Sequence, residues 1–116
     1  MAYNKKLAEQ AQKIISVLKE LETVSAVPEE KKMFGGICWP VQGSMAGGII
    51  NDDLIVRVGP DNYKEALGRP HTRVFDVTGK VMKGWIMVSP NGWVTDAELE
   101  KWVRQGVTFA LTLPPK

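Results

Sequence analysis

The chain has 116 residues, of which 44% are hydrophobic and 24% charged, a composition typical of a folded single domain and unlike that of disordered chains. It contains no apolar run of about 18 residues and opens on no secretory leader, so we predict one cytoplasmic domain over residues 1–116 without a membrane-spanning segment. A single cysteine, Cys38, excludes an internal disulfide. Because His71 is the only histidine, the chain also lacks the ligands of a Cys/His zinc site.

The net charge of +2 is too small to indicate a nucleic-acid-binding protein by itself. The middle of the chain is more basic, because residues 57–83 hold six basic and three acidic side chains. Such a segment is typical of an ordinary solvated surface, and it is also able to neutralise phosphates, so both interpretations stay open. The six basic residues are Arg57, Lys64, Arg69, Arg73, Lys80 and Lys83.

The N-terminal part of the chain has the apolar spacing of an amphipathic helix. We predict this helix over residues 4–24, with Asn4 as its N-cap and the Val27-Pro28 step beyond its end. Its apolar stripe consists of Leu7, Ala8, Ala11, Ile14, Ile15, Leu18 and Leu21.

Short segments of β-type sequence follow from residue 33 onward. Residues 33–39 predict two strands separated by Gly35-Gly36 and stopped by Pro40. Residues 44–50 and 53–58 predict a hairpin with Asn51-Asp52 as its turn. A short helix over 60–67, with Pro60 at its first position, and two strands over 72–77 and 84–89 complete the middle of the chain.

The last element is a helix that begins at Asp96, because Thr95 and Glu98 have the spacing of a capping box. Val94 and Leu99 stand at the spacing of a hydrophobic staple. Gly106 interrupts the apolar face of this helix, and together with Gly47-Gly48 it marks a place where another backbone comes close.

The residue types that most often carry chemistry are present without the partners that chemistry requires. The glycines between residues 35 and 48 match neither the phosphate-loop nor the dinucleotide-loop spacing and lie among strands, which favours turns and bulges. Cys38 has no evident base and is better explained by packing. His71 lacks a companion carboxylate, nucleophile or metal set, so a surface position is the simpler interpretation.

Four tryptophans are many for this length, and with nearby arginines they are able to provide stacking surfaces for bases. Most are better explained by packing, and Trp102 falls on the apolar stripe of the last helix. Trp85, with Lys83 two residues before it, is the aromatic residue that we retain as part of a partner surface.

Several short motifs lie along the chain at Met33, Phe34, Gly35, Gly36, Gly43 and Met45, followed by Leu54-Ile55-Val56-Arg57, Phe75-Asp76-Val77-Thr78-Gly79-Lys80 and Met82-Lys83-Gly84-Trp85. In these motifs the chain resembles the N-terminal domain family of the TfoX/Sxy competence regulators, in its small stand-alone bacterial form. The resemblance implies an α+β fold: a curved antiparallel β-sheet of about five strands, with an N-terminal and a C-terminal helix packed on it and a short helix between. The elements read from the residues agree with this architecture. Named members of the family regulate DNA-uptake genes alongside transcription machinery.

These observations lead to three functional hypotheses. The first is a non-enzymatic regulatory module that binds another protein, since no catalytic set is complete; it needs no cofactor and no metal. The second is direct nucleic-acid binding through residues 57–83. The third is a small-molecule sensor or enzyme with a pocket near His71. A free edge strand would also permit a homodimer. The predicted partner or nucleic-acid surface comprises Arg57, Arg69, His71, Arg73, Lys80, Lys83 and Trp85.

Overall fold

The computed structural model describes residues 4–18, 30–33, 36–41, 43–76 and 79–113. Within these residues the helices are α1 (Lys5–Ser16), α3 (Tyr63–Leu67) and α4 (Asp96–Leu111), with a 3₁₀ turn, η1 (Pro90–Gly92). The strands are β1 (Lys31–Met33), β2 (Gly36–Val41), β3 (Ser44–Ile50), β4 (Asp53–Arg57), β5 (Thr72–Val74) and β6 (Trp85–Val88).

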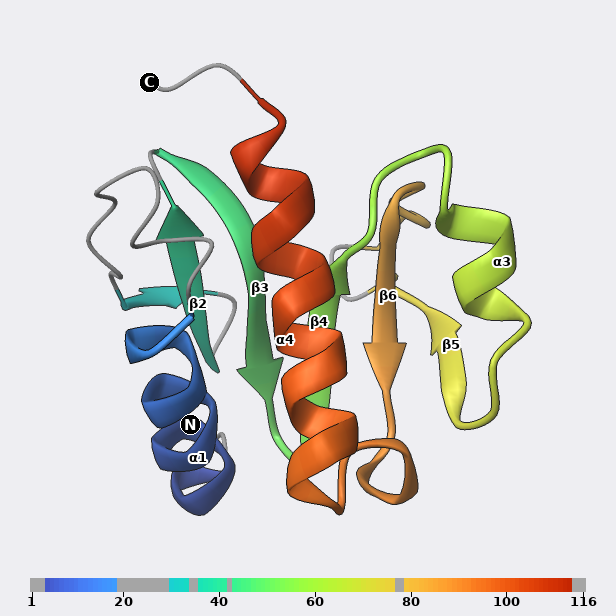
Figure 1. Cartoon of the computed structure of the whole chain (residues 1–116). Coiled ribbons are helices and arrows are strands. Elements are labelled where there is room, and N and C mark those ends of the chain that lie inside the picture. The colour runs from blue at the N-terminus through green and yellow to red at the C-terminus, as the bar shows by residue number, and fades with distance from the viewer. Residues whose placement is uncertain (1–3, 19–29, 34–35, 42, 77–78, 114–116) are drawn as a thin grey trace.

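The strands form one antiparallel sheet in the order β1-β2-β3-β4-β6-β5 (Figure 1). The first four are neighbours in sequence order, whereas β6 lies beside β4 and places β5 at the outer edge. The α+β class is therefore confirmed, with six strands in the described residues where the sequence predicted about five. None of the helices in the described ranges has the length and apolar character needed to cross a membrane.

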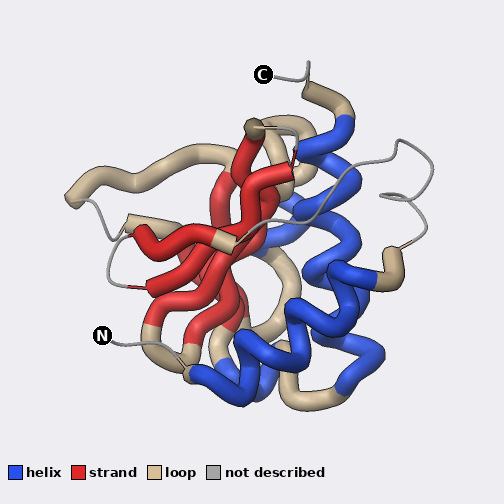
Figure 2. The backbone as a smooth tube through the Cα atoms, turned by 90° about the vertical axis from the view of Figure 1, so that its left-hand side faces the viewer, coloured by secondary structure: helices blue, strands red, loops and turns tan. Residues whose placement is uncertain are grey.

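One face of the sheet packs against the helices, which lie together on one side of the strands (Figure 2). Because side chains alternate along a strand, Leu54 and Val56 of β4 point into this helix-side core while Ile55 points away from it. On the opposite face, Ile55 and Met87 pack with Phe75, which belongs to the connection between β5 and β6. The far face of the sheet is thus covered partly by a loop rather than by a helix.

Helix α4 approaches the sheet very closely at Gly106. A Cβ atom on Gly106 would lie 2.3 Å from the carbonyl oxygen of Ala46 in β3. The sheet register shifts here, since Trp39 pairs with Gly47 but Pro40 pairs with Met45, leaving Ala46 as a bulge residue. The predicted close approach at Gly106 is confirmed, and the backbone that comes close belongs to the same chain.

The turn between β3 and β4 holds the start of α1. Asn4 caps this helix as predicted, because its side chain accepts a hydrogen bond from the Leu7 amide at 3.0 Å. The Asn4 amide also donates to the carbonyl of Asn51, and the Trp93 indole donates to the carbonyl of Asp52 at 2.9 Å. Asn51 adopts a left-handed conformation with φ 55°, which asparagine tolerates well. The predicted Asn51-Asp52 turn is confirmed.

Several predicted boundaries near the N-terminus are wrong. Strand β1 begins at Lys31 rather than at residue 33, and Gly36 begins β2 rather than separating the two strands. Helix α1 ends at Ser16, where the sequence predicted a helix to residue 24; residues 19–24 lie outside the described residues. Strand β2 continues through Pro40 to Val41 rather than stopping there. The reason is that β1 pairs with β2 only as far as Cys38, so beyond that point β2 has a strand on one side alone and tolerates proline.

Several boundaries later in the chain also differ from the prediction, among them the end of β4 at Arg57 where a strand to residue 58 was predicted. Helix α3 begins at Tyr63 after a turn at residues 60–62, so Pro60 is not its first residue. Strand β5 ends at Val74, since Phe75 turns inward to cover the sheet, and residues 77–78 are outside the described ranges. Strand β6 spans only Trp85–Val88 because Gly84 has a φ of 92°, outside the β region.

The start of α4 at Asp96 is as predicted, and Thr95 accepts a hydrogen bond from the Glu98 amide at 3.2 Å. The reciprocal contact differs from an ideal capping box, since the Glu98 carboxylate accepts from the Thr95 hydroxyl at 2.9 Å. Val94 is 67% exposed and Leu99 is buried, so the predicted staple contributes little here.

Candidate interaction surface

The predicted surface residues do not form one continuous patch. Arg57 and Trp85 are cross-strand partners at one end of the sheet, whereas Arg69 and His71 line a cleft beside the first turns of α4. Arg73 projects from the edge strand β5. Lys80 and Lys83 belong to the loop before β6.

Arg57 is held between two aromatic rings. Its guanidinium carbon lies 5.1 Å from the centroid of Trp85 and 5.4 Å from that of Phe109, and its Nη1 donates to the carbonyl of Met45 at 3.4 Å. Cation–π attraction at such distances joins β4, β6 and the C-terminal half of α4. The ring of Trp85 also packs against Phe75, with centroids 5.9 Å apart. Arg57 therefore stabilises the fold, and the Trp85 ring is already in contact with Arg57 and Phe75.

We expect Arg57→Lys to lower the free energy of unfolding by about 1 kcal/mol although it keeps the charge, because an ammonium group lacks the flat surface that faces both rings. Chemical denaturation of the purified variant measures this loss. Lys83→Ala, at an exposed lysine on the neighbouring loop, is the control and should leave stability unchanged. Equal losses in both variants would contradict a role for the rings.

Arg73 is also engaged within the chain. It forms an ion pair with Asp53 at the start of β4, and its Nη1 donates to the Ser89 hydroxyl at 3.1 Å. These contacts tie the edge strand β5 across β6 to β4. Because its charge is balanced, Arg73 contributes less to an anion-binding surface than the sequence suggested.

The cleft at Arg69 and His71 has a volume of about 160 Å³. Arg69 is fixed in one wall, since Nε and Nη2 donate to the Glu65 carboxylate at 3.0 and 3.1 Å and Nη1 donates to Gln105 at 3.0 Å. Its guanidinium lies 4.7 Å from the ring centroid of Trp102, whose indole donates to the Gly92 carbonyl at 3.1 Å. These contacts hold Arg69 and Trp102 in place at the cleft.

The carboxyl of Glu65, beside this cleft, has its pKa lowered by neighbouring cations. The hydrogen bond from Arg69 lowers the pKa of its carboxyl, and the charges of Arg69 and Lys101 act in the same direction. The carboxylate therefore stays ionised to a lower pH than an ordinary glutamate, and the pair with Arg69 persists in mild acid.

The loop before β6 presents an apolar side chain between two lysines. Val81 is 55% exposed, Lys80 and Lys83 are exposed, and within the described residues neither lysine has an ion pair. Backbone hydrogen bonds hold the loop: Met82 donates to Phe75, and the amides of Val58 and Gly59 donate to the carbonyl of Gly84. Phe75 and Met82 anchor it on the far face of the sheet.

Cys38 is buried in β2 at 3% exposure, as the packing interpretation predicted. Burial raises the pKa of its thiol, an effect that the charge of Lys31 opposes, so the group is protonated at neutral pH. A buried neutral thiol is a poor nucleophile.

The motif residues serve chain geometry where the structure describes them. Gly36 begins β2, and a Cβ there would lie 2.0 Å from the Ile49 carbonyl oxygen. Gly43 turns the chain between β2 and β3 with a φ of 85°. The Met45 carbonyl accepts from Arg57, and Met33 ends β1. Phe34 and Gly35 lie outside the described residues.

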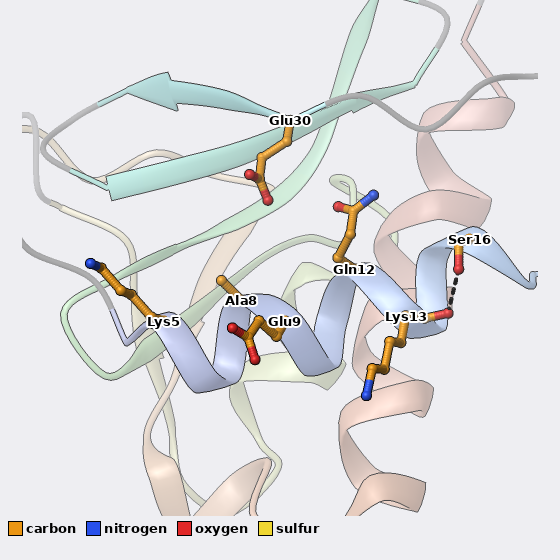
Figure 3. A pocket seen from close by; sticks show the side chains of 7 residues that line it. All are labelled: Lys5, Ala8, Glu9, Gln12, Lys13, Ser16 and Glu30. Atoms are coloured by element: carbon orange, nitrogen blue, oxygen red, sulfur yellow. Dashed lines mark hydrogen bonds between the residues drawn. The ribbon is translucent and has the colours of Figure 1, made fainter.

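A further hollow, which was not predicted from the sequence, lies between α1 and the chain at Glu30 (Figure 3). It has a volume of about 520 Å³, and its lining combines the cations Lys5 and Lys13 with the anions Glu9 and Glu30. The helical spacing of charged residues on the polar side of α1 was the available signal, but that pattern is equally typical of a solvated helix. A mixed-charge lining favours no single class of ligand.

Together these features define an antiparallel α+β domain whose arginines reinforce the fold and whose exposed lysines surround an apolar loop tip. Comparison with protein-family models finds the TfoX N-terminal domain over residues 18–110, and the chain belongs to this family. The matched residues begin just after α1. No curated protein and no solved structure matches the chain significantly.

Proposed function

We propose that this protein is a non-enzymatic regulatory module that acts in the cytoplasm by binding another protein, in the manner of a competence or transcription regulator. The observation that carries the proposal is the loop at residues 79–84, which exposes Val81 between Lys80 and Lys83 on a hydrogen-bonded framework. Family membership supports the regulatory class.

The framework of this loop favours recognition because a preordered segment loses little conformational entropy on binding. Gly79 and Gly84 both have positive φ values, 90° and 92°, which fix the path of the loop at either end. An apolar tip flanked by cations fits a partner that offers a small hydrophobic recess bordered by acidic side chains.

Three observations support a non-enzymatic role. The thiol of Cys38 is buried and protonated, and Arg57 and Arg73 are held by aromatic rings and a carboxylate. His71 is exposed, and within the described residues it forms no ion pair with a carboxylate. These side chains lie in separate places rather than around one reacting centre.

Site-specific photo-cross-linking tests the proposal. A benzophenone amino acid is introduced at Val81 and, as a matched control, at Val94, which is similarly exposed but lies before α4. Irradiation in cells should join a defined protein to position 81 and not to position 94. Adding Lys80→Glu and Lys83→Glu should reduce the yield at position 81 at least about tenfold, since both charges border the contact.

The product must survive nuclease treatment and be identified by mass spectrometry as one protein. Equal labelling at both positions, or labelling that the charge reversals leave unchanged, would refute the proposal that residues 79–84, here called the docking loop, bind the partner. Products that disappear on nuclease treatment would instead support direct nucleic-acid binding.

Direct nucleic-acid binding is the second candidate, because Lys80 and Lys83 are exposed and free to approach phosphates. Trp85 supports it less, since Arg57 and Phe75 already contact its ring and leave less surface for a base. For this reason we rank the protein partner first.

A further inference from the structure

We propose that the cleft between the α3–β5 connection and the first turns of α4 is a binding site for a single oxyanion group, a carboxylate or a phosphate. The inference is independent of the docking loop, since it concerns different residues. The groups that would hold the anion are His71, Lys101 and the outward edge of the Arg69 guanidinium.

The cleft has the size of one functional group. Its volume of about 160 Å³ is smaller than the sites that enclose whole drug-sized molecules, which measure roughly 300–1,000 Å³. A carboxylate with a short carbon chain, or a phosphate, fits such a space. The cleft therefore suits the charged end of a ligand rather than an entire large ligand.

The wall that carries His71 is held in an unusual conformation. His71 has a φ of 66°, in the left-handed region that favours glycine, so the fold maintains a conformation that costs an L residue energy. Its carbonyl accepts from the Ser89 amide at 2.9 Å. Gly92 makes the close packing possible, because a Cβ there would lie 3.1 Å from the Cβ of His71 and 2.5 Å from Val88.

The connection before His71 is fixed as well. The Thr72 hydroxyl lies 2.8 Å from the Arg69 carbonyl oxygen and 3.1 Å from that of Ala66, so it closes the turn from α3 into β5. Strained residues persist where their surroundings determine them fully, and they occur preferentially at binding sites. The fold thus places the imidazole at the cleft at an energetic cost.

The cation that favours an anion at the cleft is Lys101, because the charge of Arg69 is balanced by its ion pair with Glu65 and Arg69 offers only its remaining N–H groups. Lys101, on α4, has three donors, and in the described part of the chain it has no ion pair within 4 Å. His71 adds a donor in either protonation state, and Arg69 keeps two N–H groups beyond those bonded to Glu65 and Gln105. The opposing carboxylate, Glu98, accepts from the Thr95 hydroxyl at the rim.

His71 makes the test direct, because it is the only histidine of the chain and its imidazole proton NMR signals are unique. We expect inorganic phosphate or glutarate, at constant ionic strength, to shift these signals saturably. The other charged groups at the cleft are Arg69, Lys101 and Glu98, together with Glu65, whose carboxylate is paired with Arg69.

Two variants and a control separate this site from unspecific ion binding. Lys101→Gln keeps the His71 reporter and should weaken binding at least about fivefold, since it removes the most open cation. His71→Asn, followed through the indole N–H signal of Trp102, should weaken binding while the melting temperature stays the same, because asparagine accepts the left-handed conformation. Lys80→Gln, in the docking loop, should bind as the unaltered protein does.

A third probe distinguishes the source of the anion. A short N-acetylated peptide with a C-terminal glutamate that binds more tightly than glutarate indicates a partner's carboxylate, whereas equal or weaker binding indicates a free small acid or phosphate. His71 signals that move no more with either anion than with sodium chloride would overturn the proposal. So would binding that Lys101→Gln and His71→Asn both leave unchanged.

Discussion

Gly106→Ala is expected to lower the free energy of unfolding by about 2–4 kcal/mol, an unusually large effect for adding one methyl group. The added Cβ would lie 2.3 Å from the carbonyl oxygen of Ala46, and this oxygen belongs to backbone that a rotamer change does not move. Helix α4 would have to separate from β3, losing packing along its buried face. Urea denaturation followed by circular dichroism measures the change.

The sign of this effect is informative, because helix propensity alone predicts the opposite. Alanine in place of a helical glycine stabilises an exposed site by about 1 kcal/mol. Thr108→Ala, at an exposed position of the same helix, is the matched control and should be neutral or slightly stabilising. A stabilised Gly106→Ala variant would show that α4 does not approach the sheet as closely as described.

Trp102→Ala is expected to cost about 3–5 kcal/mol, because it removes a large buried ring from the helix-side core and the surface on which Arg69 lies. Trp102→Phe separates the two contributions. It keeps most of the ring but leaves the buried carbonyl of Gly92 without its indole donor, which should cost about 1–3 kcal/mol. Thermal and urea unfolding of both variants provide the measurement.

Trp93→Phe is the control for the hydrogen bond. Trp93 also donates its indole N–H to a backbone carbonyl, that of Asp52, but this contact is exposed and water is able to replace it. Its loss should therefore cost less than about 1 kcal/mol. If Trp93→Phe and Trp102→Phe cost the same, the burial of the Gly92 carbonyl is not what makes Trp102 important.

Local signals in the sequence were sufficient to predict the parts of the fold that depend on neighbouring residues. The start of α4 follows from Thr95, the turn of the β3–β4 hairpin follows from Asn51-Asp52, and both are confirmed. Boundaries set by long-range contacts were not predictable in this way. The continuation of β2 through Pro40 depends on where β1 stops, and the early end of β5 depends on Phe75 packing over the sheet.

The candidate site shows the same division. Sequence reasoning selected Arg57, Arg69 and Arg73 for their charge, but their engagement depends on Phe109, Gln105 and Asp53, which lie far away in the chain. Lys101 and Gly92 were missed at the cleft, because nothing near them in sequence points to His71. The family motif, by contrast, was recognisable from consecutive residues, and the family is confirmed.

The loop that covers the far face of the sheet performs two tasks with one segment. Phe75 and Met82 close over Ile55 and Met87, while Val81, a neighbour of Met82, projects outward. Local opening of this segment would expose core side chains and displace the outward ones at the same time. A partner that binds only the closed loop therefore suppresses such opening. Slower amide hydrogen exchange in β4 and β6 would then show that the partner is bound.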